Sequence, residues 1–397
     1  MDKLTKFLAH LIVLLSLNQA TIYRIPITQE IYYGISFIVV LYLVIFSKHS
    51  NPNWLIIWFI TGAIISLIVN QPPEFFQANY RLLSFILMIV LIGPVFNSSL
   101  LSKFKTKIFY ITNWILVFLV FASFIVYVLA IPLPTAHLGF SGFFNHSMML
   151  GPLSAVALIS VLTLRQKNKN QRLPQRKILL LYGSLFSSFF CLLLASSRGA
   201  IIGGIAAFLF FIFKINNLSI QKFFTSIILV GAILIISFPL WSEYTARIQE
   251  KNDLSAEVGD LAASRRSHWE GRKKEFYENP IFGIGFAVVE VNDNENQVNV
   301  ATGTIEPGSS WLAALSMLGI FSCIPLFILF GKYFIKLYSD KSNLINSAAL
   351  GAILIFFIVH MFAEGYFLAS GSYLFFYEWL LLGNIDIYLK NKEISII

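Results

Sequence analysis

The chain has 397 residues, of which 57% are hydrophobic and only 12% are charged, and its formal net charge is +9. Soluble domains usually carry about 25% charged residues, so this composition excludes a water-soluble globular protein. The basic excess would suit a nucleic-acid partner, but the positions of the basic residues indicate membrane orientation instead.

Apolar segments recur along the chain, each near the roughly 20 residues that a helix needs to cross a bilayer. They predict an all-α polytopic membrane protein with about twelve transmembrane helices, at residues 6–20, 31–47, 54–70, 82–98, 108–131, 147–164, 178–196, 199–214, 223–241, 309–331, 343–363 and 372–388. The first segment is the shortest. Lys3 and Lys6 before an apolar run at 7–17 also fit a signal peptide, although we expect a retained helix.

The basic residues lie mainly on one side of this arrangement. If the N-terminus is cytoplasmic, the cytoplasmic segments hold nineteen of the 29 Lys and Arg residues. The short outer segments hold three (Arg24, Arg81 and Arg198), and the remaining seven lie in one long loop. Basic residues concentrate in short cytoplasmic loops, so both termini are predicted to be cytoplasmic. No nucleic-acid partner is expected.

Arg198 lies between two apolar helices, in the sequence Ser196-Ser197-Arg198-Gly199-Ala200. An arginine at the hydrocarbon boundary is costly unless it faces a polar cavity or an anion. Arg198 would also begin the next helix, where free backbone N–H groups and the helix dipole favour anions. Two interpretations stay open at this stage, an anion site or a side chain that reaches lipid phosphates.

The segment 242–308 is the one long connection between the predicted helices, with twelve acidic and seven basic residues and a net charge of −5. Residues 254–278 have a helical composition, and 281–286 predict a turn back to the membrane surface. A loop of this length predicts a functional role. The chain therefore divides into helices one to nine (1–241), an outer loop that carries part of the active site (242–308), and helices ten to twelve (309–397).

Five cations lie within ten residues of this loop: Arg265, Arg266, Arg272, Lys273 and Lys274. Arginine can bind a phosphate through two parallel hydrogen bonds, so the cluster predicts an anion site. Trp269 and Tyr277 are candidate sugar contacts. The alternative is a solvated helix face with ion pairs such as Glu270 with Lys274.

A general base would come from the acids and histidines near the outer helix ends: Glu306, Glu364, His146 and, in the loop, His268. His360 lies four residues before Glu364 and shares its helix face. For each residue the ordinary interpretation is a satisfied polar group. Cys191 and Cys323 fall inside predicted helices, and no metal-ligand spacing or phosphate-binding loop appears, so neither a metal nor a cofactor is expected.

Four motifs follow one another in a characteristic order: Ser197-Arg198-Gly199-Ala200, Arg266-xx-Trp269, Asn279-Pro280-Ile281-Phe282-Gly283-Ile284-Gly285-Phe286, and Trp311-Leu312 with Leu318-Gly319-Ile320-Phe321. The stretch Gly142-Phe143-Phe144-Asn145-His146 precedes them. In this order and topology they resemble the bacterial O-antigen polymerase and O-antigen ligase superfamily. The resemblance covers about residues 140–325.

The resemblance implies a metal-independent glycosyltransferase with a GT-C-like membrane bundle, whose donor is a glycan on undecaprenyl diphosphate. Arg198 and Arg266 would hold the diphosphate, helped by Arg265 and Arg272. Asn145 and His146 would contact the substrate. Glu364, Glu306 or His268 would act as the base. Expected partners are lipid-linked oligosaccharides, the bilayer, and flippase and chain-length regulator proteins.

Ligases of this superfamily usually carry a histidine just before the tenth helix, where this chain has Glu306-Pro307-Gly308. The difference favours a polymerase of O-antigen, capsule or exopolysaccharide repeat units. It would act at the outer face of the bacterial inner membrane. One alternative is a ligase that transfers the glycan to lipid A core or protein. Another is a flippase for the same lipid, which the nearly charge-free predicted helices disfavour.

Overall fold

The protein is built almost entirely of helices. The computed structural model describes residues 3–47, 51–133, 140–216, 225, 263–290, 298–299 and 304–391. The helices in these residues are α1 (Lys3–Leu17), α2 (Gln29–Ile45), α3 (Trp54–Asn70), α4 (Ala78–Ile92), α5 (Ser99–Val128), α6 (Ser147–Lys167), α7 (Gln175–Leu194), α8 (Arg198–Asn216), α11 (Ala263–Glu278), α12 (Ser310–Ser339), α13 (Leu344–His360) and α14 (Tyr373–Asn391). A short 3-10 helix spans Glu74–Phe76.

The described strands form two short antiparallel pairs, β1 (Asn51–Pro52) with β2 (Phe96–Asn97), and β3 (Val298–Asn299) with β4 (Thr304–Ile305). Eleven predicted helices overlap α1–α8 and α12–α14, while the ninth, at 223–241, lies outside the described residues. The helix expected at 82–98 ends at Ile92, because Gly93 and Pro94 follow it and proline cannot continue a helix.

Helix length and composition identify a membrane protein. Six helical segments among the described residues are long and apolar enough to cross a bilayer: Glu74–Ile92, Ser99–Val128, Ser147–Lys167, Gln175–Leu194, Arg198–Asn216 and Ser310–Ser339. Large apolar side chains such as Phe118 on α5 and Leu179 on α7 point outward and are exposed, as expected of surfaces that contact lipid. The all-α membrane fold is thus confirmed, and the count of twelve crossings stays a prediction.

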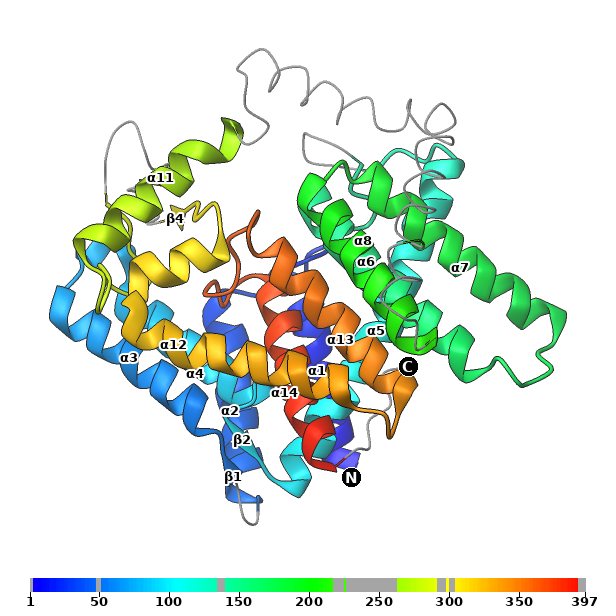
Figure 1. Cartoon of the computed structure of the whole chain (residues 1–397), viewed down its shortest axis with the longest axis horizontal. Coiled ribbons are helices and arrows are strands. Elements are labelled where there is room, and N and C mark those ends of the chain that lie inside the picture. Colours follow the sequence, from blue (N-terminus) through cyan, green and yellow to red (C-terminus); the bar gives the residue numbers. More distant parts are fainter. Residues whose placement is uncertain are drawn as a thin grey trace.

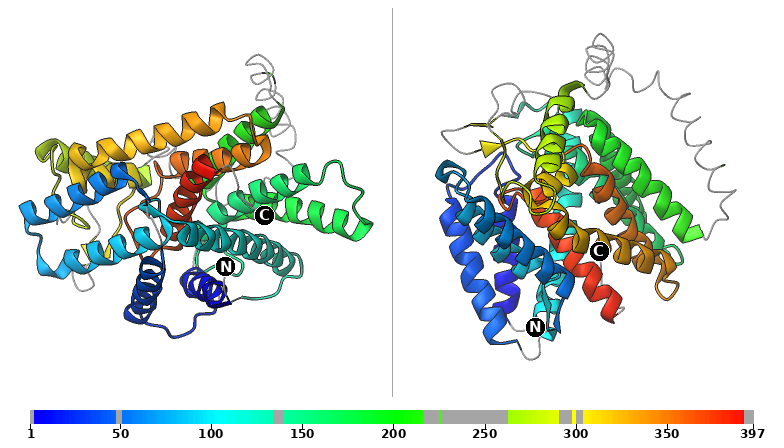
Figure 2. Two further views of the ribbon diagram at one scale, coloured as in Figure 1. Left: turned by 90° about the horizontal axis from the view of Figure 1, so that it is seen from below. Right: turned by 60° about the vertical axis from the view of Figure 1, so that its left-hand side comes forward.

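The helices pack as two groups joined by α13 and α14 (Figure 1). Helices α5, α6, α7 and α8 contact one another on one side, and α12 packs along α3 on the other. Helix α13 packs along α8 and also touches α12, so it links the groups. Helix α11 lies over the N-terminal part of α12, as both views in Figure 2 also show.

Helix α12 is broken at Gly319, whose φ of 68° and ψ of 178° are not helical. The segment 279–286, which includes the turn predicted at 281–286, lies against this break. Four backbone hydrogen bonds join the two segments: Ile284 N to Ser316 O (2.9 Å), Gly285 N to Met317 O (3.1 Å), Ile320 N to Pro280 O (2.8 Å) and Phe321 N to Ile281 O (3.2 Å). The backbone groups freed by the break are therefore satisfied inside the protein, as a membrane helix requires.

A buried ion pair fixes α11 to α12. The side chain of Arg272 is fully buried, and its Nη1 lies 3.0 Å from Glu275 Oε2. The same Nη1 donates to Ser316 Oγ (3.2 Å) and to Val288 O (3.3 Å). Burial raises the pKa of Glu275, and the neighbouring Arg272 guanidinium acts against that shift. Because this pair orients α11, it also orients the residues at the start of that helix.

Candidate active site

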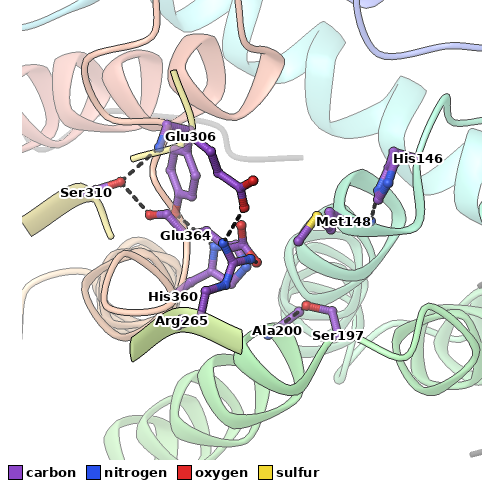
Figure 3. A network of polar contacts seen from close by, with 10 residues as sticks. His146, Met148, Ser197, Ala200, Arg265, Glu306, Ser310, His360 and Glu364 are labelled. Carbon is purple, nitrogen blue, oxygen red and sulfur yellow. Dashed lines mark hydrogen bonds and ion pairs between the residues drawn. The ribbon is translucent and has the colours of Figure 1, made fainter. Parts of the chain in front are cut away.

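One arginine joins two carboxylates from distant parts of the chain. Arg265, near the start of α11, donates from Nη1 to Glu306 Oε1 (2.9 Å) and from Nη2 to Glu364 Oε1 (2.7 Å), as Figure 3 shows. The Arg265 side chain is only 17% exposed, and those of Glu306 and Glu364 are 49% and 19% exposed. The site is therefore open to solvent mainly on the Glu306 side.

Ser310 holds the two carboxylate-bearing segments together. Its backbone N–H donates to the carbonyl oxygens of Met361 and Glu364, both at 2.9 Å. Its hydroxyl donates to Glu364 O (2.7 Å) and accepts from the backbone N–H groups of Tyr366 (3.0 Å) and Phe367 (3.2 Å). Five hydrogen bonds at this one residue, two from its backbone N–H and three at its hydroxyl, fix where Glu364 leaves the end of α13.

A buried histidine and tyrosine lie behind Glu364. His360 is the last residue of α13, and its Nδ1 is 3.0 Å from the hydroxyl of Tyr366. The His360 ring stacks on Phe356, with ring centroids 5.2 Å apart. Burial raises the pKa of Tyr366 well above its usual range, so this hydroxyl stays protonated. Both side chains are buried and support the Glu364 segment from inside.

Arg198 begins α8 at the same end of the bundle. Ser196, two residues before it, adopts a left-handed conformation (φ 53°), which turns the chain sharply from α7 into α8. A Cβ on Gly199 would lie 2.8 Å from Ala363 Cβ and 3.6 Å from His360 Cδ2. The close approach that glycine allows therefore sets the start of α8 against the residues that flank Glu364. Figure 3 draws the first turns of α6 and α8 across from Arg265.

The three arginines predicted on α11 differ in their burial and in the acidic residues that they contact. Arg266, expected to hold the diphosphate with Arg198, is 61% exposed and lies 4.0 Å from Glu270 on its own helix. Arg265, expected only to help, contacts both carboxylates. Arg272 is fully buried in its pair with Glu275, which favours a structural role over phosphate binding. The solvated ion-pair interpretation thus suits Arg266 better than Arg265.

The other candidates have mixed surroundings. His268 is buried against the 306–308 segment, where a Cβ on Gly308 would lie 2.6 Å from His268 Cβ. Tyr277 is largely exposed at the end of α11. Asn145 donates to the Gln19 carbonyl (3.0 Å). His146 caps α6, since its Nδ1 accepts from Met148 N (3.0 Å). The contacts of Asn145 and His146 hold the backbone that leads into α6.

Two pockets lie on opposite sides of the α12 N-terminus. An almost wholly apolar one of about 620 Å³ is lined by Trp269, Lys273, Ser309, Trp311, Leu312, Leu315, Phe327, Phe330, Ile358 and Phe362. The other, of about 360 Å³, has a mixed polar and apolar lining that includes Ser310, Pro307 and Gly365. Ser309 and Ser310, adjacent in sequence, thus line different pockets.

Sequence reasoning missed Ser310, Tyr366 and Arg81, which lines the second pocket. For Arg81 a signal was present, because it is one of only three basic residues in the short segments predicted to lie outside. Ser310 and Tyr366 gave no signal, because a serine in an apolar helix and a tyrosine in a loop are common. Their importance comes from tertiary contacts.

Comparison with known protein families gives a match. Residues 183–327 match the family model described as O-antigen ligase. The matched range runs from α7 into α12 and covers Arg198, Arg265 and Glu306. Glu364 lies beyond it. A search of curated proteins found no match.

Proposed function

Residues 183–327 identify the chain as a member of the O-antigen polymerase and ligase superfamily, and from this premise we propose that the protein is a polymerase of polysaccharide repeat units. The growing glycan leaves undecaprenyl diphosphate and is attacked by a hydroxyl group of the next lipid-linked repeat unit. The repeat units belong to an O-antigen, a capsule or an exopolysaccharide.

The observation that carries the proposal is the contact of Arg265 with Glu306 and Glu364, beside the helix start that bears Arg198. Two guanidinium groups suit a diphosphate, because each can donate two parallel hydrogen bonds to phosphate oxygens. As the bond between the sugar and the phosphate breaks, negative charge grows on the leaving diphosphate. Cations already fixed in place stabilise that charge most effectively.

The two carboxylates give the site a base. When a diphosphate oxygen takes the place of Glu306 on Arg265, the Glu306 carboxylate becomes available to accept the proton of the attacking hydroxyl. The new bond forms between that hydroxyl oxygen and the anomeric carbon, and undecaprenyl diphosphate departs with the bonding electrons. Glu364, which is more buried and held by Ser310, keeps Arg265 oriented. Because cleavage of the sugar–phosphate bond drives the reaction, neither metal nor cofactor is needed.

The apolar pocket supports a lipid-linked donor. Trp269 and Lys273 on α11 line it together with apolar side chains of α12 and α13, so it begins near the Arg265 site and continues as hydrocarbon surface. A polyprenyl chain is apolar over its whole length, and its diphosphate is anionic. An apolar pocket with cations at one end matches both parts of such a molecule.

One feature of the site supports a polymerase rather than a ligase. The place where ligases usually carry a histidine holds Glu306, which contacts Arg265 here. In the inner membrane the proposed arrangement has twelve crossings, cytoplasmic termini and the Arg265 site on the outer face, where lipid-linked repeats are delivered. A flippase and a chain-length regulator are the proposed protein partners.

The test uses purified protein and one cognate lipid-linked repeat unit, for the wild type and for Arg198→Ala. We expect a ladder of longer lipid-linked glycans from the wild type and none from the variant. Arg24→Ala serves as a matched control, because Arg24 is an exposed arginine between α1 and α2. Glycan transfer only after addition of a lipid A core acceptor would instead identify a ligase. Transport of the lipid without any transfer would identify a flippase.

A further inference from the structure

The mixed pocket of about 360 Å³ lies between α2, α4, the start of α12 and the 365–371 segment. Its polar lining comes mainly from Gln29, Tyr33, Gln77, Tyr80, Arg81 and Ser370. None of the described residues that line it carries a carboxylate. A concave surface with amide, phenol and hydroxyl groups converging on it is typical of a site for a polar small molecule.

Arg81 is the one charged residue among the described residues that line this pocket. Its side chain is partly buried, and it forms no ion pair with any acidic residue in the described part of the chain. An arginine in an apolar helix is costly unless it faces a polar cavity or an anion. The guanidinium has five N–H donors and no acceptor, so a ligand must supply oxygen atoms that accept hydrogen bonds.

Hydrogen bonds between side chains hold the pocket wall in shape. The Tyr33 hydroxyl lies 3.1 Å from Ser370 Oγ, which donates to Ser84 Oγ at 3.4 Å. The Tyr33 and Tyr80 rings meet edge to face, with centroids 6.0 Å apart, and Tyr80 remains partly exposed. An exposed aromatic ring beside fixed hydroxyl groups offers both an apolar face and hydrogen bonds, as a sugar ring requires.

This pocket adjoins the Arg265 site. Pro307, Ser310 and Gly365 line it, and these residues neighbour or hold Glu306 and Glu364. The apolar pocket lies on the opposite side of the same segment, lined by Ser309 and Trp311. The two pockets therefore adjoin, from opposite sides, the segment that follows Glu306.

We propose that this pocket binds a sugar of the acceptor glycan, with Arg81 donating to its ring, hydroxyl or carboxylate oxygens and Tyr80 packing on its face. The proposal rests on the proposed function, since it assigns donor and acceptor to the two sides of one site. It places the acceptor away from Arg198 and Arg265, which serve the donor diphosphate. Where the repeat unit contains an acidic sugar, Arg81 binds its carboxylate.

The test measures binding of the cognate repeat-unit oligosaccharide after release from its lipid, by calorimetric titration of the full-length protein in detergent. We expect saturable binding to the wild type, weakened about tenfold or more by Arg81→Gln and by Tyr80→Ala, because each removes a direct contact. Arg24→Gln is the matched control and binds as the wild type does. Arg265→Gln also retains binding, because its partner is the diphosphate.

The outcomes separate this inference from the proposed function. Equal binding by the wild type and Arg81→Gln, or no saturable binding by the wild type, would overturn the acceptor site even if glycan ladders form normally. If the wild type makes no ladder but Arg81→Gln still weakens oligosaccharide binding, the sugar-binding role of the pocket is supported and the polymerase proposal fails.

In the ladder assay, Arg81→Gln should raise the KM for the repeat unit more than it lowers kcat. The same ladder rate at every repeat concentration would contradict that expectation.

Discussion

Arg265, Arg266 and Arg272 lie on one helix, yet they have three different environments. Successive residues of an α-helix point about 100° apart, so neighbours in sequence face different surroundings. Arg265 meets two carboxylates, Arg266 is mainly exposed, and Arg272 is buried with Glu275. At the scale of single residues, the partner of each arginine rather than its charge decides what it does.

The Arg272–Glu275 pair predicts strong coupling between two substitutions. Arg272→Met leaves the Glu275 carboxylate buried without its partner, a loss expected to be about 3–5 kcal/mol. Adding Glu275→Leu removes that charge, so the double variant should be more stable than the single one. Thermal unfolding of Arg272→Met, Glu275→Leu and the double variant in detergent checks this. A double variant that is destabilised by the sum of the two single effects would rule out the coupling.

The sequence predicted a cationic cluster on this helix but could not rank its members. The arginine spacing identifies a cationic helix, whereas the partners Glu306, Glu364 and Ser316 come from segments far along the chain. Arg81 could have been singled out from charge alone, because it is one of three basic residues in the short outer segments and directly precedes the apolar helix predicted at 82–98. Nothing in the sequence shows that it lines a pocket beside Ser310.

The break in α12 is the feature that brings the Arg265 helix to the bundle. Glycine is needed at both sides of the contact. A Cβ on Gly283 would lie 2.4 Å from the Met317 carbonyl carbon, and one on Gly319 would lie 2.2 Å from Ile281 O. Both residues also have positive φ values, which L-residues with side chains adopt at a cost. The apolar pattern predicted one continuous helix at 309–331, since a glycine alone does not reveal a break.

Two alanine substitutions in the same helix test this contact. Gly319→Ala should lower the thermal unfolding temperature strongly, because strain in the left-handed region is roughly 1–3 kcal/mol and the clash with Ile281 adds to it. Gly331→Ala is the matched control, since a Cβ there meets no atom within 4 Å. It should be neutral or slightly stabilising. Equal stability of the two variants would show that the 279–286 segment does not pack against the break.

At the scale of the whole molecule, the site is assembled from α8, α11, the start of α12 and the end of α13. Apolar segments predicted the helices well, because bilayer thickness and backbone hydrogen bonding fix their length and composition. They do not determine which helices touch. The contact of α8 with α13 depends on small residues such as Gly199 and Gly203, which face Ala363 and Phe356.

The predicted orientation of the molecule can be checked by cysteine labelling in intact cells. Glu270→Cys on α11 should react with a membrane-impermeant maleimide, while Asn170→Cys in the basic 165–177 loop should react only after the membrane is permeabilised. Both positions are exposed, and the native Cys191 and Cys323 are buried, so they should give little background. Labelling of Asn170→Cys alone in intact cells would mean the opposite orientation.

In the proposed polymerase, Arg265, and not its neighbour Arg266, holds the donor diphosphate for glycan transfer. The most direct measurement is the length distribution of lipid-linked glycans made from one repeat unit by purified wild type, Arg265→Gln and Arg266→Gln at matched folded protein. We expect no ladder from Arg265→Gln and a ladder close to that of the wild type from Arg266→Gln. A normal ladder from Arg265→Gln, or its loss only in Arg266→Gln, would contradict the account.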